Sequence, residues 1–131
     1  MDGIANAGLK ARSTMYSPQL LDHFEHPRNS GELAGANVRV RVENPACGDV
    51  LELAAKLIGD NIHEIRFRAK GCVPAMACAS AMTELVKGRS IEEARALTRE
   101  DVVRAVGGLP PVSGHAAQLA IDSLRAALAR L

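Results

Sequence analysis

"VRVRVENPACGDVLELAAKLIGDNIHEIRFRAKGC", residues 38–72, is the stretch of sequence that decides the fold. In three segments of it, 38–43, 51–57 and 64–70, apolar residues recur at every second position. That period is typical of strands with one buried face, and turn residues at 58–61 separate the last two segments. Three one-sided strands in succession predict an antiparallel meander whose apolar face needs a cover.

The segments before and after these strands have helical patterns that can supply the cover. "SPQLLDHFEHPRN" (17–29) is typical of a short amphipathic helix, with Ser17 as N-cap and Pro27 ending it. Residues 73–86 are rich in small side chains and predict a second helix, which ends at Gly88.

Two capping signals and one apolar stripe predict the remaining helices. Ser90 and Glu93 form a capping box for a short helix, and Thr98 begins another. From about Gly114 onward, apolar residues recur at steps of four and three: Ala117, Ile121, Leu124, Leu128 and Leu131. The predicted fold class is therefore α+β, a three-stranded antiparallel sheet with helices packed on one face.

Length, composition and charge narrow the classes of function. The chain has 131 residues, 47% of them hydrophobic, with 16 basic and 15 acidic side chains. We interpret residues 1–14 as a flexible N-terminal leader and residues 15–131 as a single domain. The nearly balanced charge argues against a nucleic-acid partner, and no apolar run is long enough for a membrane span. The three cysteines form no evident disulfide framework, so we expect reduced thiols and a cytoplasmic location.

The strand order predicts that two cysteines and one aspartate meet at one edge of the sheet. Cys47 and Asp49 are two positions apart at the start of the second strand, so their side chains project to the same side. Cys72 follows the third strand. Because neighbouring antiparallel strands place the start of one beside the end of the other, we expect Cys72 to lie near Cys47 and Asp49.

Two of these candidate residues also stand at predicted helix starts. Cys72 precedes the helix of 73–86, where unpaired N–H groups and the helix dipole favour the thiolate form. His115 follows Pro110–Pro111 at the start of the last helix, with Ser113 as a candidate cap. If that helix docks on the same sheet, the imidazole supplies a fourth ligand beside two thiolates and a carboxylate.

Simpler interpretations apply to each residue taken alone. Cys78 lies within "AMACASAM" and is best read as a small buried hydrophobe that points away from the site. His115 alone would be an ordinary satisfied or exposed histidine, and Asp49 beside Gly48 would be a turn residue. The sequence contains no C-x-x-C pair, so an ordinary zinc ribbon is excluded.

Four segments closely resemble one protein family. "MYSPQLLDHFEHPRN", "NPACGDVLEL", "RFRAKGCVPAMACASAMTELVKGRS" and "GLPPVSGH" are similar to the IscU/SufU/NifU N-terminal family of U-type iron–sulfur cluster assembly scaffolds. The resemblance covers residues 15–131 in order. It implies a SufE/NifU-like fold and a scaffold or carrier rather than an enzyme.

The resemblance also implies a cofactor, ligands and partners. It implies a transient [2Fe-2S] cluster, with zinc or iron as alternative occupant, held by Cys47, Asp49, Cys72 and His115. Sulfur would be accepted on Cys47 and Cys72 from a cysteine desulfurase, and the cluster would pass to recipient apo-iron–sulfur proteins. A chaperone would dock on Leu109–Val112. Self-association to a homo-oligomer stays an open alternative.

One departure from the family pattern bears on mechanism. The position that matches the third family cysteine is Ala116, and the lysine that usually follows L-P-P-V is Ser113. This leaves a second interpretation open, a zinc-stabilised, assembly-impaired member that acts as an interaction module. A third, a cysteine hydrolase that uses Cys47 or Cys72, lacks an evident oxyanion loop. We further hypothesise that the hard carboxylate of Asp49 keeps the site labile among soft thiolates.

Overall fold

The computed structural model describes residues 16–45 and 47–131, so the expected leader at 1–14 lies outside the described part of the chain. The elements follow in the order α2 (Pro18–Glu25), β1 (Val38–Glu43), β2 (Val50–Ile58), β3 (Asn61–Lys70), α3 (Val73–Val86), α4 (Ile91–Arg95), α5 (Arg99–Ala105), a short 3-10 helix η1 (Pro111–Ser113) and α6 (Gly114–Leu128).

The strands form the predicted antiparallel meander. Within the described residues the sheet has three strands in the order β1-β2-β3. Val50, the first residue of β2, pairs with Glu43 at the end of β1 and with Lys70 at the end of β3. This register places the β1–β2 loop, the start of β2 and the end of β3 at one end of the sheet.

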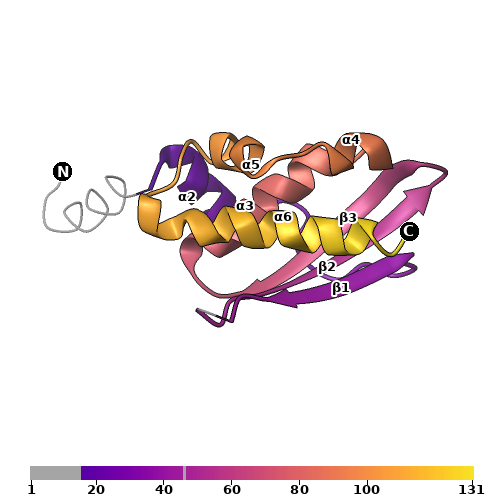
Figure 1. Cartoon of the computed structure of the whole chain (residues 1–131), viewed down its shortest axis with the longest axis horizontal. Helices are drawn as coiled ribbons and strands as arrows, with labels where there is room; N and C mark the ends of the chain where they lie inside the picture. The colour runs from indigo at the N-terminus through magenta and orange to yellow at the C-terminus, as the bar shows by residue number, and fades with distance from the viewer. Residues whose placement is uncertain (1–15, 46) are drawn as a thin grey trace, which may run out of the picture.

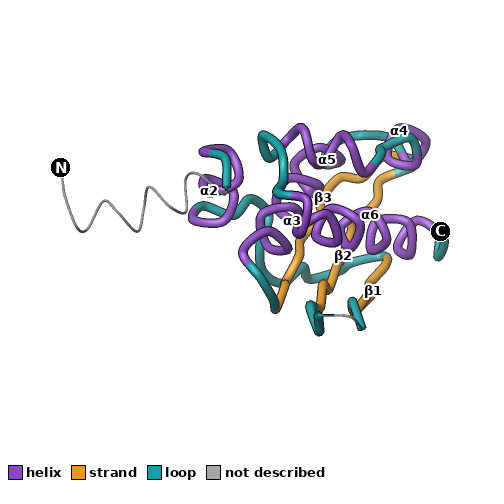
Figure 2. The backbone as a smooth tube through the Cα atoms, turned by 60° about the vertical axis from the view of Figure 1, so that its left-hand side comes forward, coloured by secondary structure: helices purple, strands orange, loops and turns teal. Residues whose placement is uncertain are grey.

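The helices cover one face of this sheet, which confirms the predicted fold class (Figure 1). Helix α6 packs on β1 and β2, α3 packs on β3, and α2 packs on α3. The two long helices α3 and α6 also contact each other, so they form one layer over the strands (Figure 2). No helix in the described ranges 16–45 and 47–131 is both long and apolar enough to cross a membrane.

The core lies between the helical layer and the apolar face of the sheet. Its largest fully buried side chains come from β2, β3 and the helical layer: Leu20, Leu51, Leu53, Ile62, Ile65, Met82, Val86, Val102, Val106, Ile121 and Leu124. Burial alternates along β1, where Val38 and Val40 are buried and Arg39 and Arg41 are exposed. Apolar burial on one face therefore fixes the register of the sheet.

The predicted helix starts are confirmed at three positions. The side chain of Ser17 accepts a hydrogen bond from the Leu20 N–H, and complete capping boxes are formed at Ser90 and Thr98. Each cap satisfies backbone donors that have no partner within the helix.

Two details of the last helix differ from the prediction. Ser113 precedes α6, but its side chain makes no capping hydrogen bond, because the chain enters α6 directly from the 3-10 helix. The apolar stripe stops at Leu128, where α6 ends, and Leu131 beyond it is 48% exposed.

The segment between α2 and β1 crosses from one edge of the sheet to the other. At β3, the Phe67 N–H donates to the Asn29 carbonyl and the Gly31 N–H donates to the Phe67 carbonyl. At its other end, the Asn37 N–H donates to the carbonyl of Ala55 on β2. Gly31 and Glu32 of this segment line a hollow on the sheet face that the helices leave open.

Candidate functional site

The loop before β2 folds back on itself and places Asp49 at the end of the sheet where β2 begins and β3 ends. The Gly48 N–H donates to the Asn44 carbonyl at 2.7 Å, and the Asn44 N–H donates to the Asp49 carbonyl at 2.7 Å. Gly48 has φ +76°, a left-handed conformation that glycine adopts without strain. Cys47 is therefore exposed on the loop while Asp49 is buried, with 4% of its surface accessible.

Cys72 lies opposite this loop, at the start of α3. It occupies the N-cap position with an extended backbone, two residues after Lys70, which pairs with Val50. Its N–H donates to Asp49 Oδ1 at 3.3 Å, and its thiol donates to Asp49 Oδ2 at 3.2 Å. One carboxylate thus contacts both the backbone and the side chain of Cys72.

His115 reaches the same point from the helical layer. It is the second residue of α6, and its Nε2 lies 3.7 Å from Asp49 Oδ2 and 3.9 Å from Cys72 Sγ. Arg99 of α5 supports this end of α6, because its guanidinium donates to the Gly114 carbonyl at 3.4 Å. The imidazole is thus placed by the helix start that the sequence indicated.

Cys47 completes the group from the exposed side. Its Sγ, one carboxylate oxygen of Asp49 and one ring nitrogen of His115 all lie within 4.8 Å of one another. Ligand atoms on a tetrahedral metal are separated by roughly 3.3 to 3.8 Å. The separations from Cys72 Sγ to Asp49 Oδ2, 3.2 Å, and to His115 Nε2, 3.9 Å, lie within about 0.1 Å of that range. The structure therefore brings together all four residues that we predicted.

The protonation of Cys72 differs from our expectation. We expected the helix N-terminus to favour its thiolate, but the pKa of Cys72 is raised above its ordinary value. Partial burial is the largest cause, and the neighbouring Asp49 carboxylate adds to it by hydrogen bonding and by its charge. The hydrogen bond from the Ala75 N–H acts in the opposite direction and is outweighed.

Cys78 stays apart from this group, as predicted. It is fully buried in α3, at 0% exposure, and burial raises the pKa of its thiol to about 12. A thiol with that pKa remains protonated near neutral pH and packs as a small apolar side chain.

Two residues that support the site were not singled out from the sequence. A Cβ atom on Gly71 would lie 2.3 Å from Asp49 Oδ1, so only glycine leaves room for the carboxylate there. A Cβ atom on Gly114 would lie 2.5 Å from the Arg99 guanidinium. The G-C dipeptide at 71–72 was a visible signal for Gly71, whereas nothing in the sequence linked Arg99 to this end of α6.

Comparison with known proteins now places the chain in a family. The NifU-like N terminal domain family matches residues 15–131. The chain belongs to this family.

Its relatives include named scaffold proteins. It is 43% identical over 114 residues to the iron-sulfur cluster assembly scaffold protein IscU 1 of Archaeoglobus fulgidus, covering 87% of this chain and 74% of that protein. It is 42% identical over 118 residues to the iron-sulfur cluster assembly scaffold protein IscU of Escherichia coli (strain K12), covering 87% and 91%.

Solved structures show the same fold at lower identity. A NifU-like N-terminal protein of Brucella abortus has a TM-score of 0.74 at 17% identity, covering 91% of this chain and 95% of that one. A protein of Fervidobacterium islandicum AW-1, described as an iron-sulfur cluster assembly scaffold for the SUF system, has a TM-score of 0.75 at 20% identity, covering 88% and 98%. These two similarities establish the fold.

Proposed function

We propose that this chain is an iron–sulfur cluster assembly scaffold that holds a [2Fe-2S] cluster, or its metal precursor, and transfers it to apo-proteins. The observation that carries the proposal is the contact of a thiol, a carboxylate and an imidazole from three separate elements, with separations of 3.2 to 3.9 Å. The names and the 42% to 43% identity of its relatives support the same function.

The residues of the site fit such a cargo. Cys47 and Cys72 supply soft thiolates, His115 supplies an imidazole nitrogen, and Asp49 supplies a hard oxygen. Mixed ligation by thiolate and imidazole occurs in biological iron–sulfur centres. The carboxylate is the poorest match for a sulfur-rich shell, so we assign to Asp49 the role of keeping the cargo releasable.

Sulfur would enter through Cys47. It is exposed, whereas Cys72 is half-buried and carries a thiol whose pKa is raised. The Cys47 thiolate would attack the outer sulfur of a persulfide on a cysteine desulfurase. The desulfurase S–S bond breaks, the desulfurase thiolate leaves, and Cys47 carries the new persulfide. Two electrons from an external reductant then release that sulfur as sulfide.

The proposed partners follow from the exposed side of the site. A cysteine desulfurase would approach Cys47, and recipient apo-proteins would use the same rim later. The Leu109–Val112 segment leads to this rim, and Val112 at its tip is 80% exposed, which suits a chaperone contact. All three cysteines are free, which agrees with a reducing compartment such as the cytoplasm.

Anaerobic reconstitution tests the proposal. The chain is incubated with ferrous iron, cysteine, a cysteine desulfurase and an external reductant, and we expect charge-transfer absorption with about two irons per cluster. Cys47→Ser and Cys72→Ser should each abolish the chromophore, and Cys78→Ala is the matched control that should keep it. One tightly bound zinc without any chromophore would overturn the scaffold and support the interaction module instead.

A further inference from the structure

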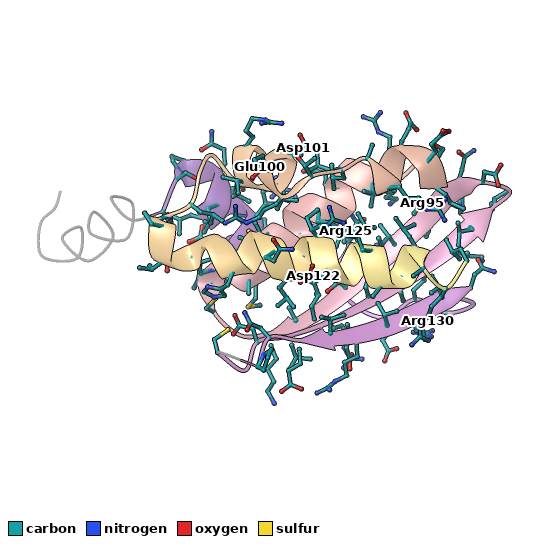
Figure 3. The ribbon with its side chains drawn as sticks, in the orientation of Figure 1. Arg95, Glu100, Asp101, Asp122, Arg125 and Arg130 are labelled. Atoms are coloured by element: carbon teal, nitrogen blue, oxygen red, sulfur yellow. The ribbon has the colours of Figure 1, made fainter. Side chains whose placement is uncertain are left out.

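The sheet face opposite the helices carries a hollow rich in arginine. The hollow has a volume of about 410 Å³. Among the described residues, five arginines line it, which we call the arginine hollow: Arg39, Arg41, Arg66, Arg68 and Arg130. Arg130 reaches it from beyond the end of α6, beside β1 (Figure 3).

The strand register explains why four of these arginines gather. Arg41 and Arg68 flank Glu52 in one row across the three strands, because Glu52 pairs with both of them. Ala54 pairs with Arg39 and Arg66 in the next row. Residues two apart on a strand share a face, so both rows stand on the open face.

Positive charge is in excess within the hollow. Its lining has two acidic residues, Glu32 and Glu52, and five arginines. The whole chain has a formal net charge of only +1, so this face holds a concentration of charge that the rest of the chain does not. Arg68 contacts Glu32 at 2.8 Å and Arg41 contacts Glu52 at 3.8 Å. Carboxylates are therefore groups that these guanidinium side chains already bind.

The arginine hollow continues toward the candidate metal site. A neighbouring hollow of about 390 Å³ shares Arg41, Glu52 and Arg68 with it and extends to Val50 and Lys70. Val50 follows Asp49 in the chain, and Lys70 precedes Gly71. An extended ligand on this face would thus run along a cationic path that ends at the rim bearing Cys47.

We propose that the arginine hollow is a docking surface for an acidic segment of a partner protein, which it holds beside the Cys47 rim. Guanidinium groups bind carboxylates in a bidentate manner, so spaced Asp and Glu side chains suit this surface. Glu32 and Glu52 interrupt the positive charge and disfavour a polymer with a phosphate at every residue. The inference goes beyond scaffold activity, since it concerns a surface and needs no cluster.

A reactive peptide tests whether an acidic segment binds the arginine hollow and whether its end reaches Cys47. The probe has about eight residues, which span roughly 26 Å when extended, with Asp or Glu at alternate positions and an iodoacetyl group at one end. The Cys47 thiolate displaces iodide and forms a thioether with the peptide. Mass spectrometry of the metal-free full-length chain measures the rate at which the peptide alkylates Cys47. This rate is divided by the rate at which iodoacetamide alkylates the same residue. We expect this ratio to exceed that of a Lys-containing peptide by about tenfold or more at low salt, and to fall with added salt.

Charge-reversal variants distinguish an effect of the arginine hollow from an effect of the overall charge of the chain. The double variant Arg41→Glu, Arg68→Glu should lose most of the rate advantage. The matched control is Arg95→Glu, Arg125→Glu, which makes the same charge change on α4 and α6 (Figure 3). It should keep the advantage, and circular dichroism verifies the fold of both variants.

Each other outcome overturns the proposal. Equal losses in the two double variants would mean that overall charge, and not this face, attracts the peptide. Competition by single-stranded DNA at lower concentration than by the acidic peptide would assign the face to nucleic acid. The assay uses a chain without metal and measures only alkylation of Cys47, so a failed reconstitution and a failed docking surface give different results.

Discussion

Gly71 and Asp49 share a space that holds only one side chain. A Cβ atom on Gly71 would lie 2.3 Å from Oδ1 and 2.5 Å from Cγ of Asp49, closer than side chains approach in proteins. Gly71 does not have a positive φ, so glycine is needed there for space rather than for backbone conformation. The glycine admits the carboxylate to the N–H and thiol of Cys72.

Gly71→Ala should therefore disable the site. We expect the new methyl group to push the Asp49 carboxylate away from Cys72 and to lower zinc affinity by about 10- to 100-fold, as when a ligand loses its support. The overlap should also reduce the free energy of unfolding by about 1–3 kcal/mol. Zinc affinity is measured by competition with a chromophoric chelator, and stability by urea denaturation.

A double-mutant cycle identifies the cause. In an Asp49→Ala background the carboxylate is absent, so adding Gly71→Ala should cost much less stability than it does in the parent chain. Equal costs in both backgrounds would show that the methyl group meets something other than Asp49.

Asp49→Ala should lengthen the lifetime of a reconstituted cluster several-fold and slow its transfer to an acceptor. The physical reason is that a hard oxygen in a shell of softer ligands is the weakest donor. The decay of charge-transfer absorption under anaerobic conditions gives the lifetime, and the gain of absorption by an apo-ferredoxin gives the transfer rate. Cys78→Ala, far from the rim, should change neither rate. A shorter lifetime in Asp49→Ala would contradict a releasing role for the carboxylate.

The convergence of Cys47, Asp49 and Cys72 could be predicted because it depends on strand topology alone. Once β2 and β3 are antiparallel neighbours, the residues before Val50 and after Lys70 must lie at one end of the sheet. The protonation of Cys72 could not be predicted in the same way. The helix N-terminus is visible in the sequence, whereas the burial and the Asp49 contact that raise its pKa arise only from tertiary packing.

In the fold, too, local features could be predicted from the sequence, whereas features that depend on tertiary packing could not. Strand alternation and the caps at Ser90 and Thr98 are local signals, and the structure confirms the strands and caps that they predict. The bridge between Ser30 and Phe67 is a single backbone pairing in an irregular segment, so no periodic pattern of apolar residues in the sequence predicted it. Leu131 continued the apolar step of α6, but three residues beyond the helix end it has no partner layer to pack on.

His23 should make the stability of the chain depend on pH. It is 6% exposed, with Nδ1 2.8 Å from Ser80 Oγ and Nε2 3.6 Å from Glu84. Burial lowers its pKa, the charge of Arg28 lowers it further, and Glu84 only partly opposes this. The unfolded chain therefore binds the proton more readily, so stability is lost as the pH falls below about 6.5 toward the lowered folded pKa.

Urea midpoints at about pH 7.5 and about pH 5.5 measure this effect. His23→Gln should reduce the difference between the two midpoints, while His63→Gln, at an exposed position of β3, should leave it unchanged. Carboxylates whose pKa is lowered in the folded chain titrate below about pH 5 and so contribute little in this interval. An undiminished difference in His23→Gln would exclude the α2–α3 contact as its source.

Ala116→Cys should increase the amount of sulfur that the chain accepts. From the resemblance to U-type scaffolds we predict that position 116 corresponds to a third cysteine, and the position follows His115 at the start of α6. Ala116 is 1% exposed, so one added sulfur atom should cost about 1–3 kcal/mol or less of stability. After reaction with a desulfurase and cysteine, intact mass should show more sulfur per chain, and reconstitution should give a higher cluster yield.

Ala117→Cys is the matched control, because it adds the same thiol one position further along α6 at 0% exposure. If both variants gain equally, sulfur is reaching any thiol in this part of α6; if neither gains, Cys47 and Cys72 already supply every acceptor that the site can use.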